Sequence, residues 1–293
     1  MKIVRKKKIL INLIKDFKKN NERIGFVPTM GALHQGHISL LEKSNLENTI
    51  TICSIYINPT QFNSKQDLIK YPRQELKDIE ILRATKCTLV FIPEDTEMYS
   101  NNIASLEYDF TDCLDKLEGL KRPGHFSGVI TIVQKLFNLV QPHNAYFGEK
   151  DFQQLWLIKK FIQHQSLPIK IIPCETIRDK NGLALSSRNR RLNDLEKEYS
   201  TLIFKCIFNL NKSIKELFID PLNQIITKQQ IITLKTYSIQ PLLDNPIIKL
   251  DYFEIVDTEN FSFANYINKQ KKYRILIAVY VGKIRLIDNI SIN

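Results

Sequence analysis

The sequence lacks the features that define several broad classes of protein. No apolar run approaches the ~20 residues that a membrane-spanning helix needs. The five cysteines form no C-x-x-C pair, and their odd number and irregular spacing argue against a disulfide framework and a structural zinc site. Neither the dinucleotide-binding pattern G-x-G-x-x-G nor a complete P-loop occurs. We therefore predict no membrane association and no metal ligand set supplied by the protein.

The N-terminus has only part of a secretory signal. Basic residues 5–8 precede the apolar run ILINLI, but Lys15 and Asp16 interrupt that run at once, and no small-residue cleavage site follows. We predict an amphipathic first helix here and a cytoplasmic protein.

The charge is strongly positive. The chain of 293 residues carries a formal net charge of +11, and 43% of its residues are hydrophobic, which is enough for a sizeable core. The basic residues are spread along the chain and no RNA-binding signature occurs, so we expect anionic small substrates and no nucleic acid. The abundance of Lys, Ile and Asn is a second source of this charge, because a biased genome would also produce it.

Short apolar runs alternate with helical patterns through the first part of the chain, which indicates a doubly wound, Rossmann-like parallel sheet with helices on both faces. The strands are expected at 24–27, 49–57, 89–92, 145–147 and 169–173, and the helices near 37–46, 74–86, 127–140 and 151–165. Residues 190–240 are helical in pattern, and 250–257 and 273–290 alternate as strands, with Gly282 at a turn. We predict a Rossmann-like domain over 1–176 and a smaller α+β domain over 177–293.

The stretch PTMGALHQGHISL, residues 28–40, follows the first major strand with two histidines at the start of a helix. A helix N-terminus offers unpaired N–H groups and a partial positive charge, which suits phosphate. Gly31 would allow close approach of the backbone, and Gly36 would leave room for a base or ribose. The spacing of His34 and His37 places both imidazoles on one side of the first turn.

Further cations and hydrogen-bond donors follow other strands and helices. FGEKD (147–151) supplies Lys150 and Asp151, RPGHFSG (122–128) supplies Arg122 and His125, and LALSSRN (183–189) is a polar loop with one cation. In an open α/β sheet, ligands bind beyond the carboxyl ends of the strands. Together these motifs favour a triphosphate site over a solvated helix end.

In order and spacing, these motifs resemble the pantothenate synthetase (pantoate–β-alanine ligase) family. The similarity is dense over residues 24–192, through PTMGALHQGHISL, NPTQF, YPR, RPGHFSGVITIVQKLFNLVQP, AYFGEKDFQQL and TIRDKNGLALSSRN, and it resumes at RLIDN near the C-terminus. The resemblance implies a nucleotidyltransferase fold, in which the domain over 1–176 binds nucleotide and pantoate and the domain over 177–293 carries a closing loop at residues 185–188. It further implies a cytoplasmic homodimer. It also implies an ATP- and Mg²⁺-dependent ligase that condenses (R)-pantoate with β-alanine through a pantoyl adenylate, releasing AMP and pyrophosphate.

The resemblance also implies roles for individual residues. His34, His37, Lys150 and Arg188 would be catalytic. Gln61, Gln154, Arg122 and His125 would bind pantoate or β-alanine, and Mg²⁺ would be held mainly by ATP phosphates. The expected ATP-binding residues are Met30, Gly31, Ala32, Leu33, His34, Gln35, Gly36, His37, Gly148, Glu149, Lys150, Asp151, Ile177, Leu185, Ser186, Ser187 and Arg188.

Four positions depart from the pattern of the family. Gln74 stands where Thr is usual, Ser100 where Pro is common, His143 where Asp is usual, and Leu185 where Met is common. None of these changes removes a group assigned to phosphate or pantoate. His143 could change the local charge or the ending of a helix.

Three other functions compete with this one. A phosphate-accepting nucleotidyltransferase would need extra cations where this chain has Gln61 and Gln154. A fragment of an aminoacyl-tRNA synthetase would need a larger C-terminal domain for tRNA. A nucleic-acid-binding protein would need a concentrated basic face.

Overall fold

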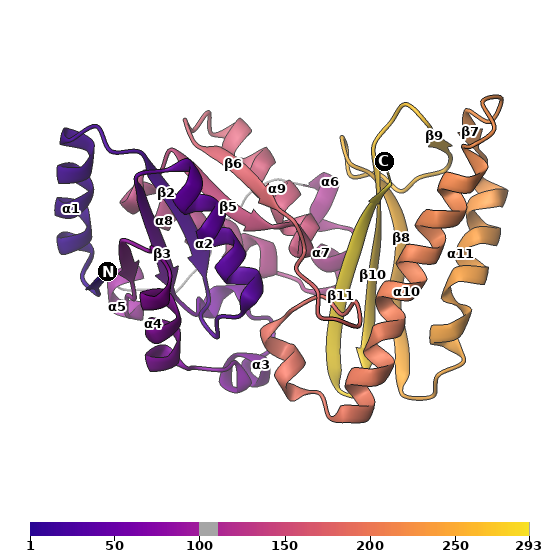
Figure 1. Cartoon of the computed structure of the whole chain (residues 1–293), viewed down its shortest axis with the longest axis horizontal. Coiled ribbons are helices and arrows are strands. Elements are labelled where there is room, and N and C mark those ends of the chain that lie inside the picture. Colours follow the sequence, from indigo (N-terminus) through magenta and orange to yellow (C-terminus); the bar gives the residue numbers. More distant parts are fainter. Residues whose placement is uncertain (100–110, 293) are drawn as a thin grey trace. The chain divides into compact units, whose positions relative to one another are not determined.

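The buried apolar runs of the first part of the chain pair side by side in one parallel sheet (Figure 1). The computed structural model describes residues 1–99 and 111–292 and divides into two compact units, Met1–Glu175 and Thr176–Asn293. The strands of the first unit are β1 (Lys2–Val4), β2 (Ile24–Thr29), β3 (Ile50–Ile55), β4 (Leu89–Phe91), β5 (Asn144–Gly148) and β6 (Lys170–Cys174). Every residue of β3 and β4 is buried, as expected of strands covered on both faces.

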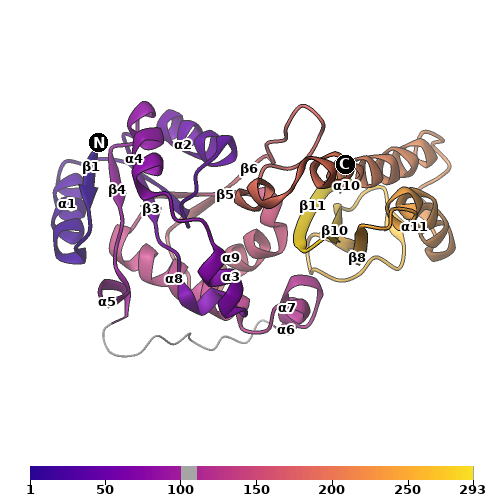
Figure 2. The ribbon, with the colours of Figure 1, turned by 90° about the horizontal axis from the view of Figure 1, so that it is seen from below.

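Helices cover the sheet of the first unit on both faces, with α2 and α4 on one face and α8 and α9 on the other (Figure 2). The helices and turns of this unit are α1 (Lys7–Lys19), α2 (Gln35–Glu47), η1 (Pro59–Gln61), α3 (Lys65–Lys70), α4 (Glu75–Ala84), α5 (Asp95–Met98), α6 (Thr111–Leu114), α7 (Leu117–Lys121), α8 (His125–Val140), η2 (Glu149–Asp151) and α9 (Phe152–His164). The predicted fold class is therefore confirmed.

The N-terminus differs in part from the prediction. The amphipathic helix is present as α1, which buries Leu10 and Ile14. The residues before it form the short edge strand β1, which pairs parallel to β4 from Lys2 opposite Leu89 to Val4 opposite Phe91. Only Val4 of its three residues is buried, so the strand is too short to show a pattern in the sequence.

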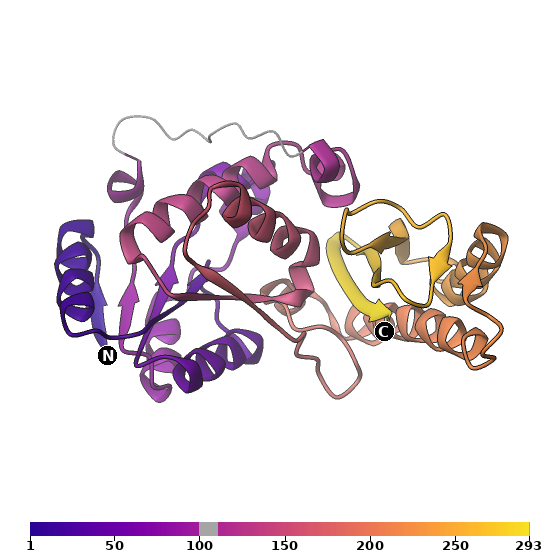
Figure 3. The same ribbon diagram turned by 90° about the horizontal axis from the view of Figure 1, so that it is seen from above.

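The second unit packs helices against an antiparallel sheet, as predicted. Its elements are η3 (Ser187–Arg191), α10 (Asp194–Leu217), β7 (Ile225–Ile226), α11 (Lys228–Leu243), β8 (Ile248–Asp257), β9 (Ile267–Asn268), β10 (Tyr273–Val281) and β11 (Ile284–Ile292). The three-stranded sheet has the order β11-β10-β8, and β11 leads to the C-terminus (Figure 3). Gly282 has a φ of 55° in the turn between β10 and β11, where glycine adopts the left-handed backbone without strain.

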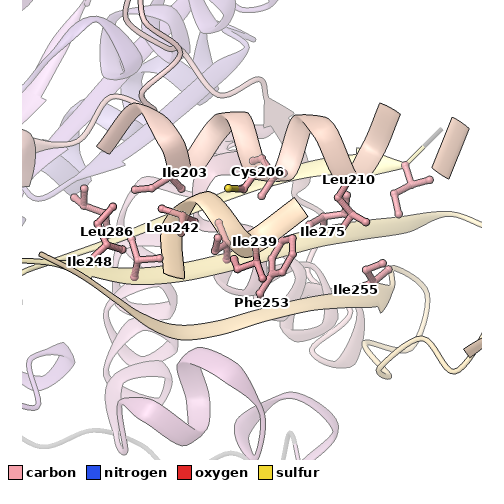
Figure 4. Close-up of a cluster of buried hydrophobic side chains, with 14 of the residues drawn as sticks. Ile203, Cys206, Leu210, Ile239, Leu242, Ile248, Phe253, Ile255, Ile275 and Leu286 are labelled. Carbon is pink, nitrogen blue, oxygen red and sulfur yellow. The ribbon is translucent and has the colours of Figure 1, made fainter. Parts of the chain in front are cut away.

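The core of the second unit lies between this sheet and the helices α10 and α11 (Figure 4). Cys206 and Leu210 of α10 and Leu242 of α11 meet Phe253 of β8 and Ile275 of β10. Capping boxes fix where both helices begin, through Asn193 with Glu196 and Thr227 with Gln230.

All five cysteines, Cys53, Cys87, Cys113, Cys174 and Cys206, are buried as free thiols. Burial raises the pKa of Cys87, Cys174 and Cys206 to about 11. These side chains therefore behave as small apolar groups in the packing.

His143, one of the positions that depart from the family pattern, lies at the amino end of β5. Its Nδ1 accepts a hydrogen bond from the backbone N–H of Ile24 at 3.0 Å. Burial, followed by the charges of Arg23 and Lys18, lowers the pKa of His143. The helix α8 already ends at Gln141, which has a left-handed conformation, so His143 does not cap it. The hydrogen bond to Ile24 stabilises the start of β2 instead. Ser100, another departure, lies outside the described residues.

Candidate active site

Two neighbouring strands at the centre of the first sheet create the position where ligands bind in folds of this kind. The strand order is β1-β4-β3-β2-β5-β6, so the connections from β2 and from β5 lead away in opposite directions. β2 and β5 pair directly, with Gly25 opposite Asn144 and Phe26 opposite Ala145. Ligands of open α/β sheets bind at such a topological switch point, beyond the carboxyl ends of the strands. The histidine turn follows β2 and FGEKD ends β5, so both predicted ATP motifs lie there.

A buried carboxylate holds the turn that follows β2. Gly31 and Ala32 have φ angles of 77° and 50°, and a non-glycine residue in this region costs about 1–3 kcal/mol. The two oxygens of Asp78 accept the N–H groups of Ala32 and Leu33, each at 2.8 Å. A Cβ on Gly31 would lie 2.8 Å from Asp78 Oδ2, so glycine is required by space as well as by conformation.

Asp78 was not among the residues predicted from the sequence. It lies in the first turn of α4 and is 1% exposed. An acidic residue early in a helix is ordinary in a sequence, and nothing in the local pattern connects it with residues 32 and 33. Its role becomes visible only when the sheet brings α4 beside the turn.

The two histidines cap the helix that follows. His34 Nδ1 accepts the N–H of Gly36 at 3.1 Å, and His37 Nδ1 accepts the N–H of His34 at 3.3 Å. In a neutral imidazole the proton is then on Nε2, so both rings have their N–H on the side opposite the backbone. The ring centroids are 4.1 Å apart, which confirms that both imidazoles lie on one side of the turn.

Gly36 has a local role in addition to the one expected for it. A Cβ at this position would lie 2.9 Å from Cε1 of His34, closer than such atoms approach in proteins. Glycine therefore makes room for the first imidazole, and the proposed space for a base or ribose is not needed to explain it.

Gln61 lies beside the histidine turn. It ends the short helix η1, is 8% exposed, and places its Nε2 2.7 Å from the sulfur of Met30. The buried Asn58 orients it through Nδ2, which donates to Gln61 Oε1 at 3.4 Å and to the carbonyl of Gly128 at 3.0 Å. The hydroxyl of Tyr99 donates to Asn58 Oδ1 at 2.6 Å. Asn58 was not among the residues predicted from the sequence, although it is the first residue of the motif NPTQF.

His125 connects α8 with Gln61. Its Nδ1 lies 2.7 Å from the backbone oxygen of Gln61. Burial, followed by the charge of Arg122, lowers the pKa of His125 to about 4. The ring is therefore neutral near pH 7, with Nδ1–H donating to the carbonyl and Nε2 as an acceptor. The guanidinium of Arg122 itself lies 3.6 Å from Glu118.

We expect the neutral state of His125 to make stability depend on pH. Its folded pKa, about 4, is below the ~6.5 of an unfolded chain, so the unfolded state binds more protons between these values. The contribution of neutral His125 to the free energy of unfolding is complete above about pH 6.5. It is lost as the pH falls toward 4, by an amount on the order of 3 kcal/mol. Urea unfolding of the protein and of His125→Asn, each at about pH 7 and pH 5, measures it.

The variant His125→Asn should lose less stability than the original protein between these two pH values, by roughly 2 kcal/mol. Replacement of the exposed His164 by Asn is the control for the loss of one histidine. Equal pH dependence in all three proteins would contradict the neutral, buried state of His125.

Lys150, Asp151 and Gln154 follow β5. Lys150 and Asp151 belong to the short helix η2, with the Lys150 ammonium 3.9 Å from the Asp151 carboxylate. Gln154 is half-buried in the first turn of α9. Its neighbour Gln153 is buried and structural, since it accepts the N–H of Glu118 and donates to two backbone carbonyls. Of these two neighbouring amide side chains, that of Gln154 is therefore the more exposed.

The remaining predicted ATP residues belong to the second unit. The N–H of Leu185 donates to the carbonyl of Ile177 at 2.9 Å, which joins two residues predicted to contact ATP. Ser186 accepts the N–H of Arg188 and so begins η3. The polar loop predicted over residues 183–189 thus runs into η3, which begins at Ser187.

Neither a metal cluster nor a membrane span is found in the parts of the chain that the structure describes. Across residues 1–99 and 111–292, no three His, Cys, Asp or Glu side chains gather to hold a metal ion. Within the same residues, no helix combines the length and apolar character needed to cross a membrane.

Known proteins resemble this chain over its whole length. The sequence model of the Pantoate-beta-alanine ligase family matches residues 2–291. A pantothenate synthetase of Christiangramia forsetii is 40% identical, covering 100% of both chains. The crystal structure of pantothenate synthetase from Thermus thermophilus superposes with a TM-score of 0.89 at 30% identity, covering 100% of this chain and 99% of the other. Pantoate-beta-alanine ligase from Francisella tularensis, complexed with beta-gamma ATP and beta-alanine, has a TM-score of 0.75 at 36% identity, with 99% and 97% coverage.

Proposed function

The chain belongs to the pantoate-beta-alanine ligase family, and from this membership we propose how its residues carry out the reaction. It is an ATP-dependent ligase that joins (R)-pantoate to β-alanine to give pantothenate, AMP and pyrophosphate. The observation that carries the assignment of the site is the pairing of β2 with β5, which puts the histidine turn and FGEKD at one switch point.

In the first step, a carboxylate oxygen of pantoate attacks the α-phosphorus of ATP, and pyrophosphate leaves with the electrons of the broken P–O bond. No proton moves, so the protein has to position the reactants and neutralise developing negative charge. We assign this to the Nε2–H groups of His34 and His37 and to the ammonium of Lys150. Arg188 of the second unit and the N–H groups at the start of α2 supply further donors.

In the second step, the amine of β-alanine attacks the carbonyl of the adenylate, and AMP leaves. The ammonium of β-alanine must lose a proton first. The tautomers at His34 and His37 favour donation to phosphate, because a neutral ring with its proton on Nε2 has no lone pair there to accept one. Gln61, Gln154, Arg122 and His125 form the proposed site for pantoate and β-alanine, where amides can bind hydroxyl groups without burying a charge.

Mg²⁺ fits the site as part of the nucleotide. The groups that we assign to the phosphates are imidazole, ammonium and backbone N–H groups, which contact phosphate oxygens, whereas Mg²⁺ prefers oxygen ligands and takes few of them from a protein. We therefore propose that Mg²⁺ is held mainly by the phosphates of ATP, where it neutralises their charge.

We also propose that the protein acts in the cytoplasm as a homodimer, as the family resemblance implies. Five buried cysteines that form no disulfide suit a reducing compartment. Sedimentation velocity tests the dimer, and a single monomeric species at micromolar concentration would contradict it.

Isotope exchange tests the two-step route. With ATP, Mg²⁺ and pantoate but no β-alanine, labelled pyrophosphate should enter ATP, because the adenylating groups include nothing contributed by the amine. AMP formation with all three substrates is the positive control. If the complete reaction runs and exchange without β-alanine is absent, the adenylate route is wrong. If other short carboxylates replace pantoate equally well, the roles of Gln61 and Gln154 are wrong.

A further inference from the structure

An ion pair with a buried carboxylate and a partly buried guanidinium joins β11 to the segment that leads to Arg188. Arg178 Nη2 donates to Asp288 Oδ1 at 2.9 Å, and Nη1 donates to Oδ2 of the same carboxylate. The Asp288 side chain is 2% exposed and lies on β11 opposite Ile277 of β10. The guanidinium also lies 4.0 Å from the centre of the Phe204 ring on α10. Two elements of the unit therefore fix Arg178 in place.

The same guanidinium holds a hairpin over residues 178–184. Arg178 Nη1 donates to the carbonyl of Gly182 at 3.1 Å, and the backbone of Arg178 bridges that of Ala184. Gly182 has a φ of 91°, and a Cβ there would lie 2.6 Å from the ring of Phe204. The hairpin thus has one close-fitting position against α10 and β11.

The hairpin in turn holds both ends of the Leu185–Arg188 segment. The N–H of Leu185 donates to Ile177, and Asn189 Nδ2 donates to the carbonyl of Ala184 at 3.0 Å. A connected series of contacts therefore runs from Asp288 through Arg178 and the hairpin to the residues before and after Ser186, Ser187 and Arg188.

We propose that Arg178 and Asp288 are positioning residues for the nucleotide site, and that they act by fixing the hairpin that carries Leu185–Arg188. The inference depends on the proposed role of this segment in ATP binding. A buried ion pair is weak support for stability alone, because apolar residues of similar volume are often equally stable or more so. The two parallel hydrogen bonds between Arg178 and Asp288 are directional, so their main effect is to fix the position of the hairpin.

The unit contains a matched control pair. Arg285 donates through Nε and Nη2 to Asp251 Oδ2 at 3.0 and 2.8 Å, and its ring contact is with Tyr252 at 5.8 Å. Both arginine side chains are 18% exposed. This second pair joins β11 to β8 and is not part of the hairpin.

The experiment compares Asp288→Asn, Asp251→Asn and the apolar double variant Arg178→Met/Asp288→Leu. Each is measured for kcat/KM with ATP and with β-alanine, for thermal unfolding, and for trypsin cleavage after Arg188 without nucleotide. We expect kcat/KM for ATP to fall roughly tenfold, equivalent to about 1.4 kcal/mol, in both Asp288 variants, with faster cleavage after Arg188. In the same variants kcat/KM for β-alanine should change less than about threefold. In Asp251→Asn, kcat/KM should change less than about threefold for both ATP and β-alanine.

The double variant separates positioning from stability. It should unfold at a temperature close to or above that of the original protein and still bind ATP poorly. Recovery of full kcat/KM for ATP in this variant would overturn the inference, as would an equal loss in Asp251→Asn at equal thermal stability. Unchanged cleavage after Arg188 in both Asp288 variants would also overturn it. Failure of the original protein to exchange pyrophosphate would instead contradict the proposed function, and cleavage alone would then decide whether the pair holds the hairpin.

Discussion

Lys150→Ala is expected to slow adenylation by about 10²–10³-fold, the usual effect of removing one preorganised donor from a developing charge. Lys150 lies just beyond β5, at the switch point with the histidine turn, and it is a lone cation within FGEKD. Pyrophosphate exchange with pantoate measures the step directly, since it does not require β-alanine. Thermal unfolding should change little, because Lys150 is a partly buried residue beyond the end of β5 and belongs to neither hydrophobic core.

The control for this variant is Lys160→Ala. Lys160 lies in α9, where its ammonium is 5.2 Å from the centre of the Trp156 ring. The substitution Lys160→Ala removes the same charge from the same unit as Lys150→Ala, so an effect of net charge alone would appear in both variants. Exchange within roughly threefold of the original rate in Lys150→Ala, with normal unfolding, is far below the expected loss and would contradict the role of Lys150.

Asp78→Asn is expected to have the second large effect. It should weaken the use of ATP indirectly, because Asp78 holds the backbone of the turn at Ala32 and Leu33. An amide of the same shape keeps one acceptor but places an NH₂ group against one of the two N–H groups of Ala32 and Leu33. The unpaired buried groups cost about 1–3 kcal/mol or more in unfolding free energy. The left-handed Ala32 then loses a partner that holds it, and we expect kcat/KM for ATP to fall by roughly 10–100-fold.

Glu80→Gln is the matched change on the same helix, at an exposed position. It should alter neither unfolding nor exchange beyond about 0.5 kcal/mol, the usual range for surface substitutions. Normal ATP kinetics in Asp78→Asn, combined with a loss of stability, would show that the carboxylate supports the fold without positioning the turn.

The sequence was informative where the chemistry is local. Alternation of buried runs and helical patterns predicted the central strands and most of the long helices, because each of these signals lies within a few neighbouring residues. The histidine turn and FGEKD were found for the same reason: both are short, and both directly follow a strand. β1 was missed because three residues with one buried side chain give too little pattern.

The supporting residues could not be predicted in this way. Asp78 holds residues 32 and 33, Asn58 orients Gln61 and touches Gly128, and Asp288 fixes Arg178. Asp78 and Ala32, Asn58 and Gly128, and Asp288 and Arg178 are all far apart in the chain, and the first pair also depends on the left-handed backbone at Ala32. An individual Asp or Asn has many ordinary uses in a fold, so its type and local neighbours do not identify its partner.

The strand order β1-β4-β3-β2-β5-β6 also governs how the chain can fold while it is being synthesised. Domains begin to fold from the N-terminal side as the ribosome releases them. β2, β3 and β4 can pair once residue 91 has emerged, but the other edge of β2 has no neighbour until residues 144–148 follow. During that interval the edge of β2 that includes Phe26 has no strand partner, and an unpaired strand edge is a template on which a second nascent chain can pair. The nucleotide site and this temporary hazard thus arise from the same delayed pairing of β2 with β5.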